Sequence, residues 1–348
     1  MTSPAHARQM PIRAADGPEF TAEQTWPAMA LCPATEPSPP AFEPSPPAFG
    51  PSPPAFEPTP PPPPVSQPLV RTNSLPPEWS VRRARRVLQP VFRGARALSP
   101  DDLNTRERMA ALRSLVGSGP VWAGLSAAHL LGADTQAIGL PLDLANATSG
   151  RFRHRDGVRM RRLLLTEEDI VETDLGHSMT ALRTALDLAV RGTRPLDIAR
   201  VDQVLRVGRV SVADLGALVD RSGGMRGIRT ARANLAELDP RAESIPESVL
   251  RLELVRLGLP PPTPQLEVRA PDGRVIARLD LGWKEQRVGV EYDGEYHDAD
   301  RQQRSRDRGR HNELRAVDWT VYQVDAILGR NPTAVFDLLR PHLLMPRD

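Results

Sequence analysis

Residues Val275–His297 read VIARLDLGWKEQRVGVEYDGEYH, and this stretch decides the fold expected for the C-terminal part of the chain. Polar and apolar residues alternate from Arg274 to Leu281, and β-branched and aromatic residues dominate from Val288 to Asp293. Both patterns predict strands. Polar residues at 284–286 supply a turn between them, so the stretch predicts a β-hairpin.

This hairpin carries three carboxylates, those of Asp280, Glu291 and Asp293. Counting back from the turn places Asp280 roughly opposite Val290 and Glu291, so side chains of the two strands can meet. Hard divalent cations such as Mg²⁺ or Mn²⁺ prefer carboxylate and carbonyl oxygens. We therefore predict a metal site with Asp280 and Glu291 as ligands. The alternative is that these are ordinary solvated carboxylates on an exposed sheet face.

The flanking sequence predicts the order helix, three-strand meander, helix, strand and helix for residues 243–348. The expected elements are a helix at Glu247–Leu257, a strand at Gln265–Ala270, a turn at Pro271, Asp272 and Gly273, an arginine-rich helix at Asp300–Val317, a strand at Trp319–Val324 and a helix at Pro332–Leu344.

That order, with Glu247 in the first helix, Asp280 in the second strand and Glu291 in the third, resembles the PD-(D/E)xK restriction-endonuclease-like fold. More narrowly, it resembles domains related to the very-short-patch repair (Vsr) endonucleases, in which an Asp-Gly pair and a His follow, as Asp293, Gly294 and His297 do here. The resemblance implies Mg²⁺-dependent DNA cleavage. Asp280 and Glu291 would bind the metal, Glu247 would orient a ligand water, and His297 would act as acid, base or phosphate contact.

One residue departs from the family pattern. The lysine expected two residues after Glu291 is replaced by Asp293, which removes a cation that would position water and offset charge on the phosphate. Two hypotheses follow: an endonuclease with an altered active site, and a catalytically silent protein that binds DNA or neutralises a toxin. We expect slow or absent cleavage unless His297 takes over the role of the lysine.

The arginine-rich helix carries a basic stripe at helical spacing. Its members are Arg304, Arg308, His311 and Arg315. Such a stripe favours contact with the phosphate backbone of DNA. An ordinary solvated helix face is the alternative.

The first 76 residues form a separate region. EPSPPAF at Glu36–Phe42 recurs from Glu43, and GPSPPAF follows from Gly50. So many prolines prevent helix and sheet formation, and the composition cannot bury enough apolar area to offset chain entropy. We expect a disordered tail that contributes nothing to the folded core.

Residues 77–98 are basic and predict a linker or the remnant of a winged helix, and residues 99–240 predict a mostly helical domain. Within the latter, the pattern predicts a helix start capped by Ser99, helices around Met109–Val116 and at Ser126–Leu131, strands at Pro141–Ala147 and Val158–Leu165, and four helices at Leu182–Val190, Asp197–Leu205, Val212–Val219 and Ile228–Leu238. The expected class for the whole chain is α/β (α+β).

Two segments of this middle region, GLSAAHLLGA at Gly124–Ala133 and TALRTALDLA at Thr180–Ala189, resemble AbiEi-type antitoxin-like proteins. Those proteins often carry the Vsr-like domain at their C-terminus and begin with a winged helix-turn-helix. Here Gln89–Ala95 is similar to the close of that wing. The resemblance implies a cognate toxin as a possible partner.

Composition says little about the functional class of the protein. With 45 basic and 43 acidic residues among 348, the net charge of +2 does not itself predict a nucleic-acid partner. The single cysteine, Cys32, excludes an intrachain disulfide framework and fits a reducing compartment. We find neither a signal-peptide core nor an apolar run long enough to span a membrane, so we expect a cytoplasmic, soluble protein without a membrane partner.

Overall fold

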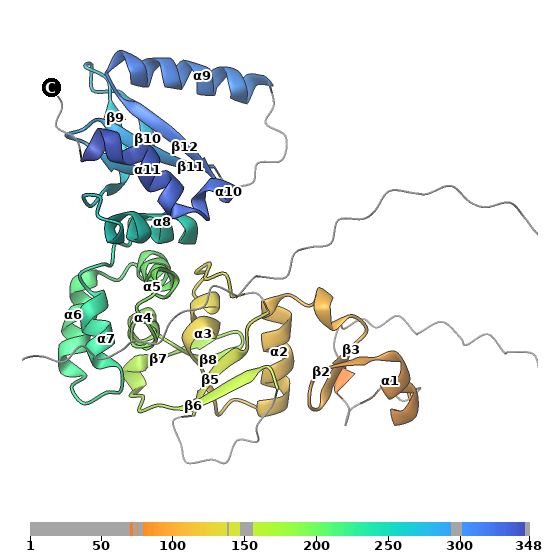
Figure 1. The fold of residues 1–348 in the computed structure, drawn as a ribbon. Helices are drawn as coiled ribbons and strands as arrows, with labels where there is room; N and C mark the ends of the chain where they lie inside the picture. Colours follow the sequence, from red (N-terminus) through yellow and green to blue (C-terminus); the bar gives the residue numbers. More distant parts are fainter. Residues whose placement is uncertain are drawn as a thin grey trace, which may run out of the picture. The chain divides into compact units, whose positions relative to one another are not determined.

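The computed structural model describes residues 70–71, 75, 79–137, 139–146, 156–293 and 301–344, although side chains are described for neither residue 70 nor residues 301–308. The chain divides into Met1–Pro61 and Pro62–Asp348, and every described residue belongs to the second unit. The described part is a mixed α/β structure with three sheets and eleven α-helices (Figure 1). This confirms the expected class. The expectation for the first 76 residues lies almost wholly outside the described residues.

The smallest sheet lies near the start of the described chain. Its strands are β1 (Val70–Arg71), β2 (Gln89–Phe92) and β3 (Ala95–Ala97), and helix α1 (Val81–Val87) precedes the β2–β3 hairpin. Strand β1 pairs with β3 in antiparallel fashion, so sheet structure extends into the stretch where proline density predicts none. The hairpin lies where a wing was expected.

The middle region contains a five-stranded sheet with the order β6-β5-β4-β8-β7. Its elements are α2 (Thr105–Val116), β4 (Val121–Trp122), α3 (Gly124–Leu130), β5 (Leu142–Asn146), β6 (Val158–Arg162), β7 (Ile170–Thr173) and β8 (Gly176–Met179), with short 3-10 helices at Pro100–Asp102 and Glu167–Asp169. Strands β5 and β6 were predicted, whereas the other three were not. Ser99 makes no side-chain capping bond; Asn104 and Glu107 instead form a capping box at the start of α2.

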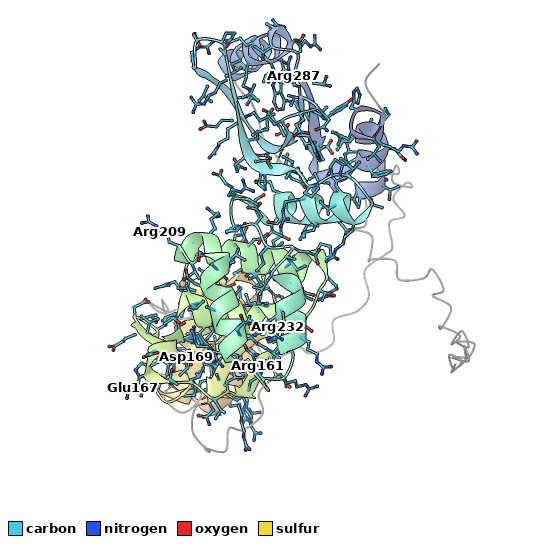
Figure 2. All side chains as sticks on the ribbon, turned by 90° about the vertical axis from the view of Figure 1, so that its left-hand side faces the viewer. Arg161, Glu167, Asp169, Arg209, Arg232 and Arg287 are labelled. Atoms are coloured by element: carbon cyan, nitrogen blue, oxygen red, sulfur yellow. The ribbon has the colours of Figure 1, made fainter. Side chains whose placement is uncertain are left out.

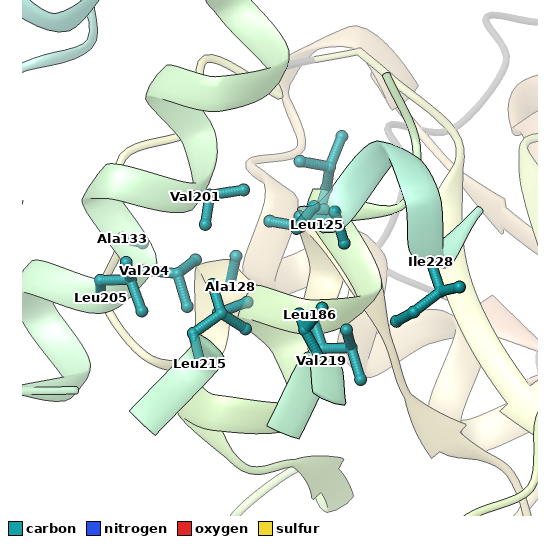
Figure 3. Packing of buried hydrophobic residues seen from close by; sticks show 14 residues of the cluster. Leu125, Ala128, Ala133, Leu186, Val201, Val204, Leu205, Leu215, Val219 and Ile228 are labelled. Carbon is teal, nitrogen blue, oxygen red and sulfur yellow. The ribbon is translucent and has the colours of Figure 1, made fainter. Parts of the chain in front are cut away.

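Four helices follow and confirm the four predicted from periodicity: α4 (Ala181–Ala189), α5 (Pro195–Gly208), α6 (Val212–Arg221) and α7 (Ile228–Asn234). Their apolar faces share one core with α3, in which Leu186, Val201 and Leu215 are fully buried (Figure 3). Burial of such side chains contributes about 1.5–3 kcal/mol each relative to exposure.

The C-terminal region has the expected order of elements plus one short helix, α10. Its elements are α8 (Ile245–Arg256), β9 (Thr263–Arg269), β10 (Val275–Trp283), β11 (Val288–Asp293), α9 (Arg301–Ala316), β12 (Thr320–Asp325), α10 (Ala326–Gly329) and α11 (Pro332–Leu343). The strands form one sheet in the order β12-β11-β10-β9, which is antiparallel except between β11 and β12 (Figure 1).

Two apolar clusters flank this sheet. Leu281 and Val290 pack with residues of α8 and α11, whereas Leu279 packs with Leu314 of α9. The alternation predicted for Arg274 to Leu281 would place Leu279 and Leu281 on one face, but it breaks at Asp280 between them, so the two leucines join different clusters. That break gives Asp280 an environment that strict strand periodicity does not predict.

Helix α8 is tied to α5 as well as to the C-terminal sheet. Asp202 of α5 is fully buried and accepts hydrogen bonds from the Ser248 hydroxyl and the Arg251 guanidinium of α8, each at 3.0 Å. Helix α8, which carries Glu247, is therefore fixed on two sides. In the described ranges we find no helix with the length and apolarity that crossing a bilayer requires.

Candidate functional site

Glu247 and Asp280 come together through the side chain of Gln265. The Gln265 amide nitrogen donates to Glu247 Oε2 at 2.8 Å and to Asp280 Oδ1 at 3.1 Å. The strand register explains this arrangement, because Leu279 pairs with Leu266 and Leu281 pairs with Pro264. Gln265 and Asp280 are thus neighbours across β9 and β10.

Gln265 has a backbone conformation that is unusual for a strand residue. Its φ of +53° lies in the left-handed region, which non-glycine residues rarely adopt. Such strain costs of order 1–3 kcal/mol and persists where the surrounding structure holds it, often at functional sites. Sequence reasoning missed Gln265, because within its strand pattern it is only one polar residue among several.

Glu247 lies at the N-terminal end of α8, and its carboxylate has several donors. The Ser244 hydroxyl donates to Oε1 at 2.8 Å, and the backbone N–H of Glu243 donates to Oε2 at 2.9 Å. Burial raises the pKa of Glu247, and the nearby charge of Asp280 adds to this effect, while the hydrogen bonds from Glu243, Ser244 and Gln265 oppose it. The carboxylate therefore binds a proton more readily than an exposed glutamate does.

Asp280 lies where the pairing of β10 with β11 ends. The last paired residues are Leu281 and Val290, and the backbone N–H of Tyr292, two residues after Val290, donates to Asp280 Oδ2 at 2.6 Å. The Asp280 carboxylate thus accepts the hydrogen bond that the Tyr292 N–H would otherwise donate to a carbonyl of the neighbouring strand. Both oxygens of Asp280 are held in place, one by Gln265 and one by Tyr292.

Glu291 follows Val290 on β11 and contacts helix α9. Its Oε2 accepts from Arg310 Nη2 at 3.0 Å, in a pair whose side chains are 13% and 35% exposed. Arg310 was not among the predicted site residues. Asp280 and Glu291 are the next residues along their strands beyond the last pair, Leu281 and Val290, and the carboxylate of Glu291 is bound to an arginine.

The remaining predicted residues have more varied positions. Asp293 ends β11 as an exposed residue in register with Asp325, which caps α10. His297 and Gly294 lie outside the described residues. Arg304 and Arg308 belong to α9 without described side chains, His311 is half-buried and Arg315 is exposed.

The carboxylates fit a divalent cation in donor chemistry. In the part of the chain that the structure describes, no three His, Cys, Asp or Glu side chains form a group that could hold a metal ion. Mg²⁺, however, is usually held by one or two carboxylates, with water and substrate phosphate completing its shell. Glu247 and Asp280 supply adjacent carboxylate oxygens, and the raised pKa of Glu247 reflects in part the charge of its neighbour, which a cation would offset.

Comparison with known proteins finds relatives that match 66% of this chain. No protein-family model matches the chain, and no solved structure matches it. Over 236 residues the chain is 33% identical to the uncharacterized protein MT2308 of Mycobacterium tuberculosis (strain CDC 1551 / Oshkosh), covering 66% of this chain and 81% of that protein. The same values hold for the uncharacterized protein Rv2248 of Mycobacterium tuberculosis (strain ATCC 25618 / H37Rv).

Proposed function

Because this chain belongs to the family of the uncharacterized Mycobacterium tuberculosis proteins MT2308 and Rv2248, whose names assign no activity, we propose its function from the site itself. The C-terminal region is a PD-(D/E)xK-like domain that hydrolyses phosphodiester bonds of DNA with Mg²⁺ or Mn²⁺. The observation that carries this proposal is the convergence of Glu247 on α8 with Asp280 on β10, a strand that pairs with β11, which carries Glu291.

In this function Asp280 and Glu291 would hold the metal ion, and Glu247 would act beside them. A bound divalent ion would supply positive charge to the phosphate and activate water. Glu247 is held close to Asp280 through Gln265, so its carboxylate is placed to orient an attacking water or take a proton from it. Gln265 would keep Glu247 and Asp280 in register through its two hydrogen bonds.

Arg310 offers a positive charge in place of the lysine that the PD-(D/E)xK pattern has two residues after Glu291. Asp293 cannot supply positive charge, whereas the Arg310 guanidinium lies 3.0 Å from Glu291 Oε2. A guanidinium stays charged at every physiological pH and binds phosphate oxygens in pairs. Arg310 would therefore contact the phosphate in place of the lysine once Glu291 turns to the metal ion.

A second candidate function is a catalytically silent DNA-binding protein or a toxin-neutralising antitoxin. Three contacts favour it: Arg310 neutralises Glu291, and each of the two oxygens of Asp280 already accepts a hydrogen bond. A site closed in this way would hold the fold together without binding metal. The Asp293 substitution favours the same interpretation.

Incubation of the full-length protein with supercoiled plasmid and Mg²⁺ or Mn²⁺ tests the proposal. We expect nicking by the parent, no nicking by Asp280→Asn, and a rate about 100-fold lower for Glu247→Gln. Glu267→Gln is the matched control, since Glu267 is an exposed carboxylate on β9 that pairs with Arg269, and it should cleave like the parent. Binding of plasmid without cleavage would favour the silent candidate, and equal cleavage by Asp280→Asn would overturn the assigned site.

A further inference from the structure

A cavity of about 980 Å³ lies in the middle region and shares no residue with the Glu247–Asp280 site. Three segments line it: residues 161–164 at the end of β6, one side of α4, and the loop 222–227 between α6 and α7. A space of this size matches that of a small-molecule site.

Four arginines line the cavity, and Asp187 is the acid among the lining residues. The arginines are Arg161, Arg162, Arg183 and Arg226. Asp187 binds the guanidinium of Arg161 and also that of Arg191, so it offsets only part of this positive charge. Arg162 and Arg226 are exposed. The cavity therefore carries excess positive charge.

Two of these arginines, Arg161 and Arg183, have a buried N–H donor that makes no hydrogen bond in the described part of the chain. Arg183 is nine-tenths buried, and its contact with Asp169 Oδ2 is long at 3.5 Å (Figure 2 marks Asp169 and Arg161). Within the described ranges, Nε of Arg183 and Nε of Arg161 are buried and have no hydrogen-bond partner. Buried donors without partners are rare in proteins, and such a group often indicates a missing anion or water. Both arginines line the cavity.

The loop 222–227 adds accessible backbone to the same wall. It reads Ser-Gly-Gly-Met-Arg-Gly, and Gly224 and Gly227 both have a φ of +84°. Neither Gly223 nor Gly224 has an atom within 4 Å of the position a Cβ would take. Glycines in such conformations let backbone N–H groups approach an anion closely.

From this geometry we propose that the cavity binds a phosphate group through its arginines and the glycine loop. Guanidinium groups bind phosphate oxygens in pairs, which matches a cavity lined by several arginines. The phosphate belongs either to a free nucleotide or to a nucleic-acid strand, since both present the same group. The proposal does not depend on cleavage by the C-terminal region.

Calorimetric titration of the full-length protein with inorganic phosphate, ADP and a short DNA oligonucleotide tests the proposal. We expect saturable binding of at least one probe that is weakened about tenfold or more in Arg162→Ala/Arg226→Ala, because two charge-assisted contacts are lost. Both residues are exposed, so the melting temperature should stay the same. The control is Arg232→Ala, an exposed arginine of α7 that pairs with Asp220 outside the cavity lining.

Preference among the probes distinguishes the two sources of phosphate. Binding of ADP without binding of the oligonucleotide identifies a nucleotide site, and tight oligonucleotide binding that weakens with salt identifies a strand contact. Either result supports the proposal if the double variant loses it and Arg232→Ala retains it. Failure of all three probes to bind, or equal weakening by the control variant, would overturn it.

Discussion

Asp202 provides the sharpest prediction about stability, because three polar groups donate hydrogen bonds to it at the contact between α5 and α8. It is fully buried and accepts from the backbone N–H of Asp239 at 2.8 Å, from the Ser248 hydroxyl at 3.0 Å and from Arg251 Nη2 at 3.0 Å. Arg251 is itself 7% exposed and also donates to the Glu237 carbonyl. The change Asp202→Ala leaves a buried guanidinium without its counter-ion.

The structure sets the expected loss in the free energy of unfolding for Asp202→Ala. Removing one partner of a buried ion pair costs about 3–5 kcal/mol, because the remaining charge stays desolvated. The donors of Asp239 and Ser248 lose their acceptor as well, so we expect the upper part of this range. The matched control is Glu313→Ala, which breaks the pair with Arg274 whose side chains are 46% and 58% exposed. Exposed pairs contribute less than about 1 kcal/mol.

Urea denaturation followed by circular dichroism at pH 8, where Asp202 is ionised, measures both losses. A second comparison adds Arg251→Met to Asp202→Ala, which removes the stranded charge and should recover part of the lost free energy. A loss below about 1 kcal/mol for Asp202→Ala, or one equal to that of Glu313→Ala, would refute the reasoning.

Three further predictions concern other parts of the chain. Burial raises the pKa of Asp202 to about 7, so the folded state binds this proton more tightly than the unfolded state does. The free energy of unfolding should therefore fall from about pH 4 to pH 7 and then level off. In a pH series of denaturation curves, the Asp202→Asn variant should lack this fall. Gly124 has a φ of +50°, and a Cβ there would collide with the guanidinium of Arg191, so Gly124→Ala should lower the melting temperature clearly, whereas Gly132→Ala should lower it less because a Cβ meets open space. Deletion of residues 1–61 should leave the melting temperature unchanged, whereas deletion of residues 1–76 should lower it, because the latter removes the pairing of β1 with β3; an equal effect of both deletions would contradict this.

The sequence predicted the C-terminal hairpin well, because its signals are local. Period-2 alternation and a polar turn determine both strands, and β11 has the predicted bounds, Val288–Asp293. The antiparallel pairing of β10 with β11 through Leu281 and Val290 also follows from counting residues back from the turn. Helices with clear periodicity, such as α5 and α6, were found for the same reason.

Features that depend on tertiary contact were not predictable in the same way. The strands β4, β7 and β8 have only two to four residues each, too few for a period to emerge. The role of Gln265 depends on a left-handed φ and on its register with Asp280. Arg310 faces Glu291 because Leu314 packs with Leu279 and fixes the rotation of α9, which no local pattern contains.

The central claim, that Asp280 and Glu291 hold a divalent metal ion beside Glu247, is tested most directly by the melting temperature of the full-length protein with and without Mn²⁺. A ligand at 100 times its dissociation constant stabilises the folded state by about 2.7 kcal/mol, so saturating Mn²⁺ should raise the melting temperature of the parent by several degrees. The rise should vanish in Asp280→Asn and persist in the control Glu267→Gln. A parent that melts at the same temperature with and without Mn²⁺, or a rise that survives Asp280→Asn, would contradict the account.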